Sequence, residues 1–174
     1  MTAASAKAPR GNRQQQKATA RLYAVQALFQ MEAARTPLPE IIREFETHRI
    51  GVAIEGDIFA EADMRLFRTI LKSAVSQQAR IDQMTDRALV AAWPINRIDP
   101  TLRAVFRAAG AELIDGRTPP KVAITEYVDV AKAFNAAGKE AGFVNAVLDH
   151  MAREARPDIF GERPKPAGGP KAED

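Results

Sequence analysis

The sequence contains no cysteine and only two histidines among its 174 residues. The absence of cysteine excludes disulfide bonds, thiolate metal sites and cysteine nucleophiles. A zinc site would need carboxylate ligands, because His48 and His150 lie about a hundred positions apart. None of the serines, which are Ser5, Ser73 and Ser76, lies in the G-x-S-x-G pattern of a nucleophile elbow. We therefore expect no metal, no cofactor and no catalytic site.

Long hydrophobic runs are also absent. The longest uninterrupted apolar run is Ala88–Trp93, whereas a membrane helix needs about 20 apolar residues. Residues 1–20 lack the apolar core of a secretory signal. Apolar residues make up 46% of the chain and charged residues 27%, which is typical of a globular protein of one domain or two small packed subdomains. We expect a cytoplasmic protein with no membrane segment.

Negative charge is missing from the start of the chain. Residues 1–31 contain five basic side chains and no acidic one, and the remaining residues carry 20 basic and 22 acidic groups. The formal net charge of +3 thus hides a cationic N-terminal segment. Such a segment is typical of proteins that bind a polyanion, either a nucleic acid or an anionic membrane surface. A solubilising tail is the alternative interpretation.

Apolar residues recur at helical spacing, and no run alternates convincingly as a strand would. The spacing predicts helices at about 14–34 and 39–49, and a long helical stretch at about 59–92 with a break or bend near 76–80. Three further helices should follow. The first starts at Asp99-Pro100, an N-cap residue followed by proline at the first helical position. About seven helices with short connections predict an all-α bundle.

Composition divides the chain into three parts. We expect residues 1–13 to form a basic flexible arm and residues 14–156 to form the helical domain. Residues 157–174 contain four prolines and three glycines, so we expect a disordered tail there.

The basic side chains near the N-terminus have helical spacing. Arg10, Arg13, Lys17 and Arg21 are three, four and four positions apart, so on a helix successive members lie about 5–6 Å apart along one stripe. Such a stripe in water could follow the phosphates of a nucleic-acid strand. A membrane-surface anchor is a weaker interpretation, because the apolar face of Leu22–Met31 is short and should be taken up by the core.

Few residues suggest catalysis. Glu126 and Asp129 are three positions apart and could share a helix face, with Lys132 a further three positions on. An exposed ladder of ion pairs explains this spacing better than a pair of catalytic carboxylates. We therefore predict a protein that is not an enzyme.

Four segments of the sequence stand out: ARLYAVQALFQ at Ala20–Gln30, RAAGAEL at Arg107–Leu113, KVAITEYVDVAK at Lys121–Lys132 and FVNAVLD at Phe143–Asp149. They resemble segments of the family of the transcription antitermination factor NusB. Ala20–Gln30 is similar to that family's A-R-x-x-A-V-Q-A-L-[YF], and Lys121–Lys132 is similar to its K-V-A-I-N-E-A-V-E-L-A-K. Phe143–Asp149 resembles its F-V-N-G-V-L-D, and Arg107–Leu113 resembles its R-x-A-x-Y-E-L. The segments occur in the family's order, within about residues 17–153. Tyr127 is a departure, because it stands where the family has a small residue.

The resemblance implies a helical fold of two three-helix subdomains and a function in transcription. It implies binding of the boxA element of ribosomal RNA leaders, and of NusE, a small-subunit ribosomal protein, in the antitermination complex of RNA polymerase. It points to Phe29 and the helix start near Asp99 and Arg103 for the protein partner. Phe143 is our candidate for an aromatic residue that faces an RNA base, with a core role as the alternative.

Two other functions were weighed against the same features. One is the NusB-like RNA-binding domain that precedes some RNA methyltransferases, which we discount because we expect no catalytic domain to follow. The other is a helical protein-interaction or dimerisation module with a basic tail. Recovery of bound RNA from a cell lysate would separate the second from an RNA-binding adaptor.

Overall fold

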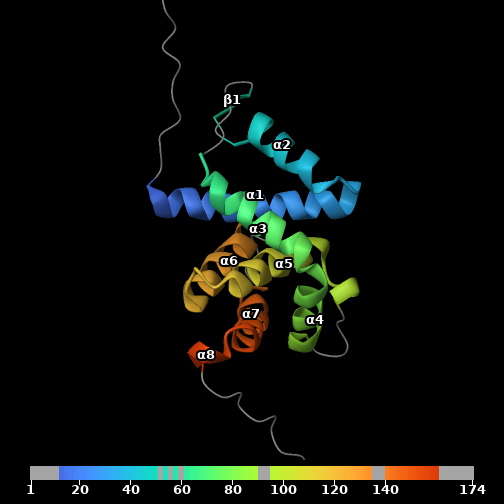
Figure 1. The fold of residues 1–174 in the computed structure, drawn as a ribbon, viewed down its shortest axis with the longest axis vertical. Coiled ribbons are helices and arrows are strands. Elements are labelled where there is room, and N and C mark those ends of the chain that lie inside the picture. The colour runs from blue at the N-terminus through green and yellow to red at the C-terminus, as the bar shows by residue number, and fades with distance from the viewer. Residues whose placement is uncertain are drawn as a thin grey trace, which may run out of the picture.

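The computed structural model of the chain describes residues 12–50, 53–54, 57–58, 61–89, 95–134 and 140–160. These residues form the helices of an all-α protein, as predicted (Figure 1). In chain order the helices are α1 (Arg13–Ala34), α2 (Leu38–His48), α3 (Met64–Ser76), α4 (Gln78–Ala88), α5 (Pro100–Asp115), α6 (Pro120–Phe134), α7 (Ala141–Ala155) and the short α8 (Pro157–Phe160). A 3-10 turn at Ile95–Arg97 precedes α5.

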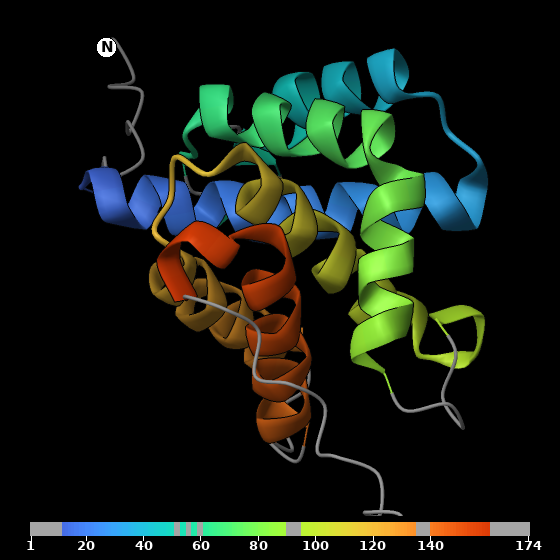
Figure 2. The same cartoon turned by 60° about the horizontal axis from the view of Figure 1, so that its bottom comes forward.

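The helices form two groups that share one core. The α1 helix packs with α2 and α3 in the first group, and α4, α6 and α7 surround α5 in the second. Figure 1 shows α3 crossing the long helix α1 with α5 below them, and in Figure 2 α3 lies above α1. The helices α1, α3 and α5 all contact one another. The α5 helix contacts α1, α3, α4, α6 and α7, and ten of its 16 residues are buried. It is therefore the centre of the structure.

Local residues explain most helix ends. The α1 helix begins with a reciprocal capping box, in which the Gln15 backbone N–H donates to the Asn12 side chain (2.9 Å) and the Asn12 N–H donates to the Gln15 side chain (3.0 Å). Asp99 accepts a hydrogen bond from the Thr101 N–H (2.7 Å) at the start of α5. Gly116 ends α5 with a φ of 77°, which is the left-handed conformation that glycine adopts without strain. The predicted start of α5 is confirmed.

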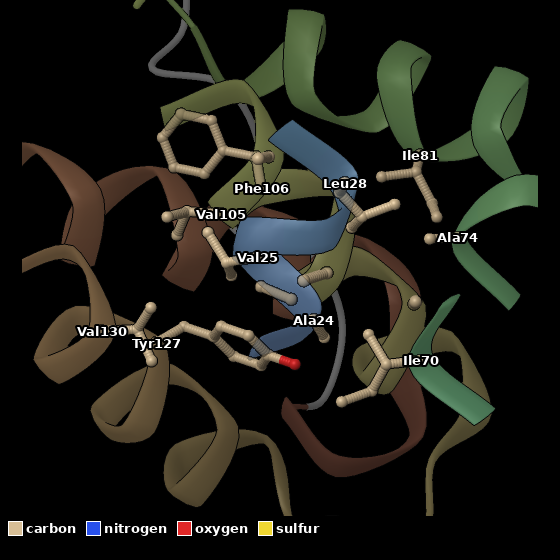
Figure 3. Close-up of a cluster of buried hydrophobic side chains, with 14 of the residues drawn as sticks. Ala24, Val25, Leu28, Ile70, Ala74, Ile81, Val105, Phe106, Tyr127 and Val130 are labelled. Atoms are coloured by element: carbon tan, nitrogen blue, oxygen red, sulfur yellow. The ribbon is translucent and has the colours of Figure 1, made fainter. Parts of the chain in front are cut away.

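The core is a single cluster of apolar side chains. Figure 3 shows Ala24, Val25 and Leu28 of α1 at its centre, with Ile70 from α3 and Phe106 from α5 around them. All five are buried. Both helix groups thus pack on this face of α1, and its burial supplies the main driving force for folding.

The break or bend predicted at 76–80 is a break at Gln77, between α3 and α4. One feature differs from the predictions. The strands β1 (Ala53–Ile54) and β2 (Asp57–Ile58) pair antiparallel in a segment for which we predicted no strand. Two residues are too few to show an alternating pattern.

The ends of the domain also need revision. Arg13, which we assigned to the flexible arm, is the first residue of α1. Pro157–Phe160, which we assigned to the disordered tail, form α8. There the Arg153 guanidinium lies over the Phe160 ring, 5.0 Å from its centroid, and this contact holds α8 against α7. Residues 1–11 and 161–174, with the rest of the predicted arm and tail, lie outside the described residues.

Candidate nucleic-acid interface

Two of the four predicted stripe residues are exposed on the first turns of α1. Arg13 and Lys17 are one helical turn apart, and both side chains reach solvent. No ion pair joins either of them to another described residue, so their charges are available to an anionic ligand. Arg10 lies outside the described residues.

Arg21 is buried, and the prediction that the whole basic stripe stays in water is wrong at this position. Its side chain is 5% exposed. Its Nε donates to Oε1 of Glu112 on α5 (2.7 Å), and its Nη2 donates to Oε2 of the same carboxylate (3.1 Å). The reason is helical geometry. Four residues turn a helix by about 400°, so a stripe with four-residue spacing rotates by about 40° per step and carries Arg21 from the solvent side into the core.

The buried ion pair extends to α6. The Tyr127 hydroxyl donates to Oε1 of Glu112 (2.8 Å), and Oε2 of Glu126 lies 3.7 Å from Nη1 of Arg21. Burial raises the pKa of Tyr127 well above its ordinary value, and the negative charge of Glu112 raises it further. Burial alone would lower the pKa of Arg21, but its hydrogen bond to Glu112 and the charge of that carboxylate raise it overall. Arg21 therefore stays charged and Tyr127 stays neutral near pH 7.

A cleft opens beside this ion pair. Its volume is about 340 Å³, and it lies between the first half of α1, the start of α3 and the turn that follows α5. Four basic residues and three acidic residues line it, together with five others. The basic residues are Lys17, Arg21, Arg65 and Arg117, and the acidic residues are Asp63, Glu112 and Asp115. The cleft is thus continuous with the exposed part of the basic stripe.

The sequence analysis missed Arg65 and Arg117 as candidate ligand-binding residues. Both lie in the part of the chain whose charges nearly balance, and neither belongs to a run of basic residues. Only the packing of α3 and α5 on α1 places them at the same cleft as Lys17. Glu112 and Tyr127 were missed as partners of Arg21 for a similar reason, since 91 positions separate Arg21 from Glu112.

Phe143 begins the motif of α7 that resembles F-V-N-G-V-L-D. Its ring is partly buried and meets the Phe106 ring edge to face, with centroids 6.3 Å apart and planes at 74°. Such a contact contributes about 0.5–1.5 kcal/mol beyond the area that it buries. The core role that we weighed for Phe143 is thus visible in the structure, and its role toward RNA stays a prediction.

The predicted partner-binding residues lie near the second half of α1. The Phe29 ring is 41% exposed, and Asp99 is exposed at the start of α5. Arg103 is only 12% exposed, because its Nε donates to Oε2 of Glu32 (2.8 Å) and its Nη1 donates to the Ile95 carbonyl (2.9 Å). Arg103 therefore acts within the chain, and only Phe29 offers an exposed apolar surface among the three.

Metal-ligating side chains do not gather in the described parts of the chain. No group of three or more histidine, aspartate or glutamate side chains there could hold a metal ion. Glu126 lies near Arg21, whereas Asp129 is exposed, so the two carboxylates do not form an acid/base pair. Among the helices that the structure describes, none is both long enough and apolar enough to span a membrane.

Comparison with known proteins identifies related sequences. The model of the NusB family matches residues 18–153. The transcription antitermination protein NusB of Rhodopseudomonas palustris (strain BisB18) is 44% identical over 155 residues, which cover 88% of this chain and 91% of that protein. The protein of the same name from Caulobacter vibrioides is 44% identical over 147 residues, with coverages of 84% and 98%.

Solved structures share the fold. NusB of T. maritima superposes with a TM-score of 0.65 at 28% identity, and the match covers 82% of this chain and 94% of that chain. A chain from a crystal structure of the antitermination factors NusB and NusE with double-stranded RNA superposes with a TM-score of 0.61 at 23% identity. That match covers 79% of this chain and 96% of the other, and at this identity it concerns the fold alone.

Proposed function

The chain belongs to the NusB family, and from this premise we propose that it is a non-catalytic transcription antitermination factor. It binds single-stranded RNA of the boxA type together with NusE, and the assembly joins RNA polymerase in the cytoplasm. The observation that carries the proposal is the match of the NusB family model to residues 18–153, which include nearly all of the described helices.

The charge distribution supports an RNA-binding role. Arg13 and Lys17 present two positive charges on successive turns of α1, and neither forms an ion pair with a described residue. Phosphate contacts of this kind supply a large part of the affinity in nucleic-acid complexes. They fix the position of the strand without reading its sequence. Base recognition must therefore come from other groups, for which the partly exposed ring of Phe143 is our candidate.

We propose that the partner binds the second half of α1. Phe29 is the exposed aromatic residue of this helix, and aromatic residues are enriched at protein–protein interfaces. Phe29 follows Lys17 by twelve positions, which is about 18 Å along the helix axis. RNA and NusE can therefore occupy the same helix without overlap. Joint binding to one rigid scaffold raises the effective concentration of each ligand for the other.

The test is RNA binding measured by fluorescence anisotropy, with and without NusE, for a boxA-like oligomer and a scrambled one. We expect tighter binding of the boxA-like RNA and a further gain with NusE. Binding should weaken with salt, with a slope of about −0.7 in log affinity against log salt for each phosphate contact. The double variant Arg13→Gln/Lys17→Gln should reduce the slope by about 1.4.

The control is Arg43→Gln/Arg80→Gln, which removes the same charge from exposed positions on α2 and α4. It should leave the slope close to that of the wild type. Absence of RNA binding by the wild type, with and without NusE, would contradict the proposal and favour a helical protein-interaction module.

A further inference from the structure

We propose that the bound RNA leaves α1 at Lys17 and enters the cleft between α1, α3 and the turn after α5, where Arg65 and Arg117 hold a phosphate group. The inference rests on the proposed function, since it assumes that RNA is the ligand. It adds a second set of RNA contacts, from parts of the chain that lie outside the cationic N-terminal segment.

The charges around the cleft favour an anion. The three carboxylates are already engaged within the protein: Glu112 accepts hydrogen bonds from Arg21 and Tyr127. Asp63 caps α3 by accepting from the Leu66 N–H (2.9 Å), and Asp115 lies 3.5 Å from the Arg117 guanidinium. Lys17 and Arg65, in contrast, are exposed and form no ion pair with a described residue. The unneutralised charge at the cleft is therefore positive.

Arg117 can also turn toward a ligand. Its side chain is 73% exposed, and its single ion pair, with Asp115, is at the long end of the range for such a contact. An exposed pair of this kind contributes about 0–1 kcal/mol. A phosphate, which accepts two parallel hydrogen bonds from a guanidinium, competes well with it.

The base of the cleft carries a hydrogen-bond donor that the fold leaves without an acceptor. Arg21 donates through Nε and Nη2 to Glu112, but its Nη1 has no hydrogen bond to any described residue, since the nearest carboxylate oxygen, on Glu126, is 3.7 Å away. Among the described residues, no fully buried side-chain nitrogen or oxygen lacks a hydrogen-bond partner. Arg21 is itself one of the residues that line the cleft. Arg21 thus reaches the RNA site from within the core.

The cleft is also large enough for part of a nucleotide. Its volume of about 340 Å³ falls in the range of ligand pockets, which begins near 300 Å³. Leu66, Ile70 and Ala111 supply an apolar part of the lining, against which a sugar or base can pack. A nucleotide whose phosphate lies at the rim and whose sugar lies inside the cleft would contact both the basic side chains and the apolar lining.

The experiment compares three double variants of the full chain with the wild type, using a single-stranded RNA oligomer and fluorescence anisotropy across a salt series. Arg65→Gln/Arg117→Gln is the test, Arg13→Gln/Lys17→Gln reports on the α1 stripe, and Arg43→Gln/Arg80→Gln is the control of equal charge. Arg80 lies on α4, away from the first half of α1 in both views of the fold (Figures 1 and 2). All the substituted side chains are exposed, so circular dichroism should show unchanged helicity.

We expect the test variant to bind about fivefold or more weakly than the wild type, and to lose about 0.7 from the salt slope, because the contact to one phosphate is removed. An RNA affinity and slope equal to those of the control variant would overturn the RNA path while leaving the proposed function intact. Absence of RNA binding by the wild type itself would instead contradict the proposed function.

A second arm identifies the source of the phosphate. Millimolar inorganic phosphate, at constant ionic strength, is titrated against each protein and followed by the NMR signals of the arginine side chains. Weak and incomplete binding supports an RNA phosphate held by its chain. Tight binding of free phosphate that Arg65→Gln/Arg117→Gln abolishes would assign the cleft to a small anion and overturn the inference.

Discussion

Arg21 of α1 and Glu112 of α5 form a bidentate ion pair in the interior, with Nε and Oε1 only 2.7 Å apart and both side chains at most 5% exposed. The pair connects the two helix groups at the point where the α1 stripe meets the cleft. It fixes the rotation of α1 about its axis, which in turn determines that Arg13 and Lys17 face solvent. A residue that resembles a nucleic-acid ligand in the sequence is therefore, first of all, part of the framework.

We predict that the single variants Arg21→Gln and Glu112→Gln will each lower the free energy of unfolding by about 3 kcal/mol, because each leaves one buried charge without its partner. The double variant Arg21→Gln/Glu112→Gln should cost clearly less than the sum of the two, since no uncompensated charge remains. Urea unfolding followed by circular dichroism measures all three.

The control for this cycle is the exposed pair of Asp149 and Arg153, four positions apart on α7, with both side chains 42% exposed. Asp149→Asn should cost no more than about 0.5 kcal/mol. Equal costs at Glu112 and Asp149 would show that the buried pair does not hold α1 in place.

Tyr127 should make the protein unstable in alkaline solution. Its pKa is raised in the folded state above its ordinary value of 10.0, so the folded protein retains a proton that the unfolded chain loses. The stability that this provides is fully present below about pH 10 and is lost as the pH rises through the folded pKa. Tyr127→Phe should lower the free energy of unfolding by about 1 kcal/mol at neutral pH, because it removes a hydrogen bond. Between about pH 9 and about pH 11, the stability of this variant should fall less than that of the wild type.

Tyr23→Phe is the comparison for this prediction. Burial also raises the pKa of Tyr23, although the charge of Arg49 acts in the opposite direction. We expect Tyr23→Phe to reduce the fall of stability at high pH by less than Tyr127→Phe does. An identical fall of stability in wild type and Tyr127→Phe would mean that the Tyr127 hydroxyl ionises without cost in the folded protein.

Glu32 should contribute to stability only above mildly acidic pH. Hydrogen bonds from Arg103, and then the charges of Arg103 and Arg107, lower the pKa of Glu32 below its ordinary value of 4.5 despite its partial burial. The stabilisation is full above about pH 4.5 and is lost as the pH falls through the folded pKa. Glu32→Gln should therefore cost up to about 1 kcal/mol near pH 7, and the difference from wild type should vanish in acid.

A pH series of urea midpoints tests this, with Asp129→Asn as the control. Asp129 is an exposed carboxylate of α6 that forms no ion pair with a described residue. Its variant should follow the wild-type curve. A constant difference between Glu32→Gln and wild type at every pH would show that the lost interaction does not depend on the charge of Glu32.

Two helical glycines should respond in opposite ways to alanine. A Cβ at Gly110 of α5 would lie 2.5 Å from Cγ2 of Ile81 and 3.3 Å from Cε of Met151, so α4 and α7 can approach α5 this closely only because no side chain is present. Gly110→Ala should cost about 1–3 kcal/mol. A Cβ at Gly142 of α7 meets nothing within 4 Å, so Gly142→Ala should be neutral or stabilise by about 0.5–1 kcal/mol.

Thermal unfolding of the two glycine variants measures both effects. The comparison separates packing from helix propensity, because the substitution is the same in each case. Stabilisation by Gly110→Ala would show that α4 and α7 can move away from α5 without loss.

The sequence predicts helix ends well where a few neighbouring residues decide them. At α5, the start is decided by Asp99 and Pro100 and the end by Gly116. These residues act through hydrogen bonds and dihedral angles within one turn. The paired strands β1 and β2 were missed because their two-residue length carries no periodic signal. The short α8 was missed because its contact between Arg153 and Phe160 joins residues that the proline-rich composition assigns to different parts.

The sequence by itself determined the helical class, the approximate helices, the cationic start of the chain and the family, because these depend on composition, local spacing and motif order. Only the tertiary structure decided which cations face water. Lys17 and Arg21 differ by one turn of the same helix, yet one is exposed and the other is buried against Glu112. That difference depends on where α5 and α6 pack, and a carboxylate 91 positions away in the chain acts on Arg21 only once folding has brought it within hydrogen-bonding distance.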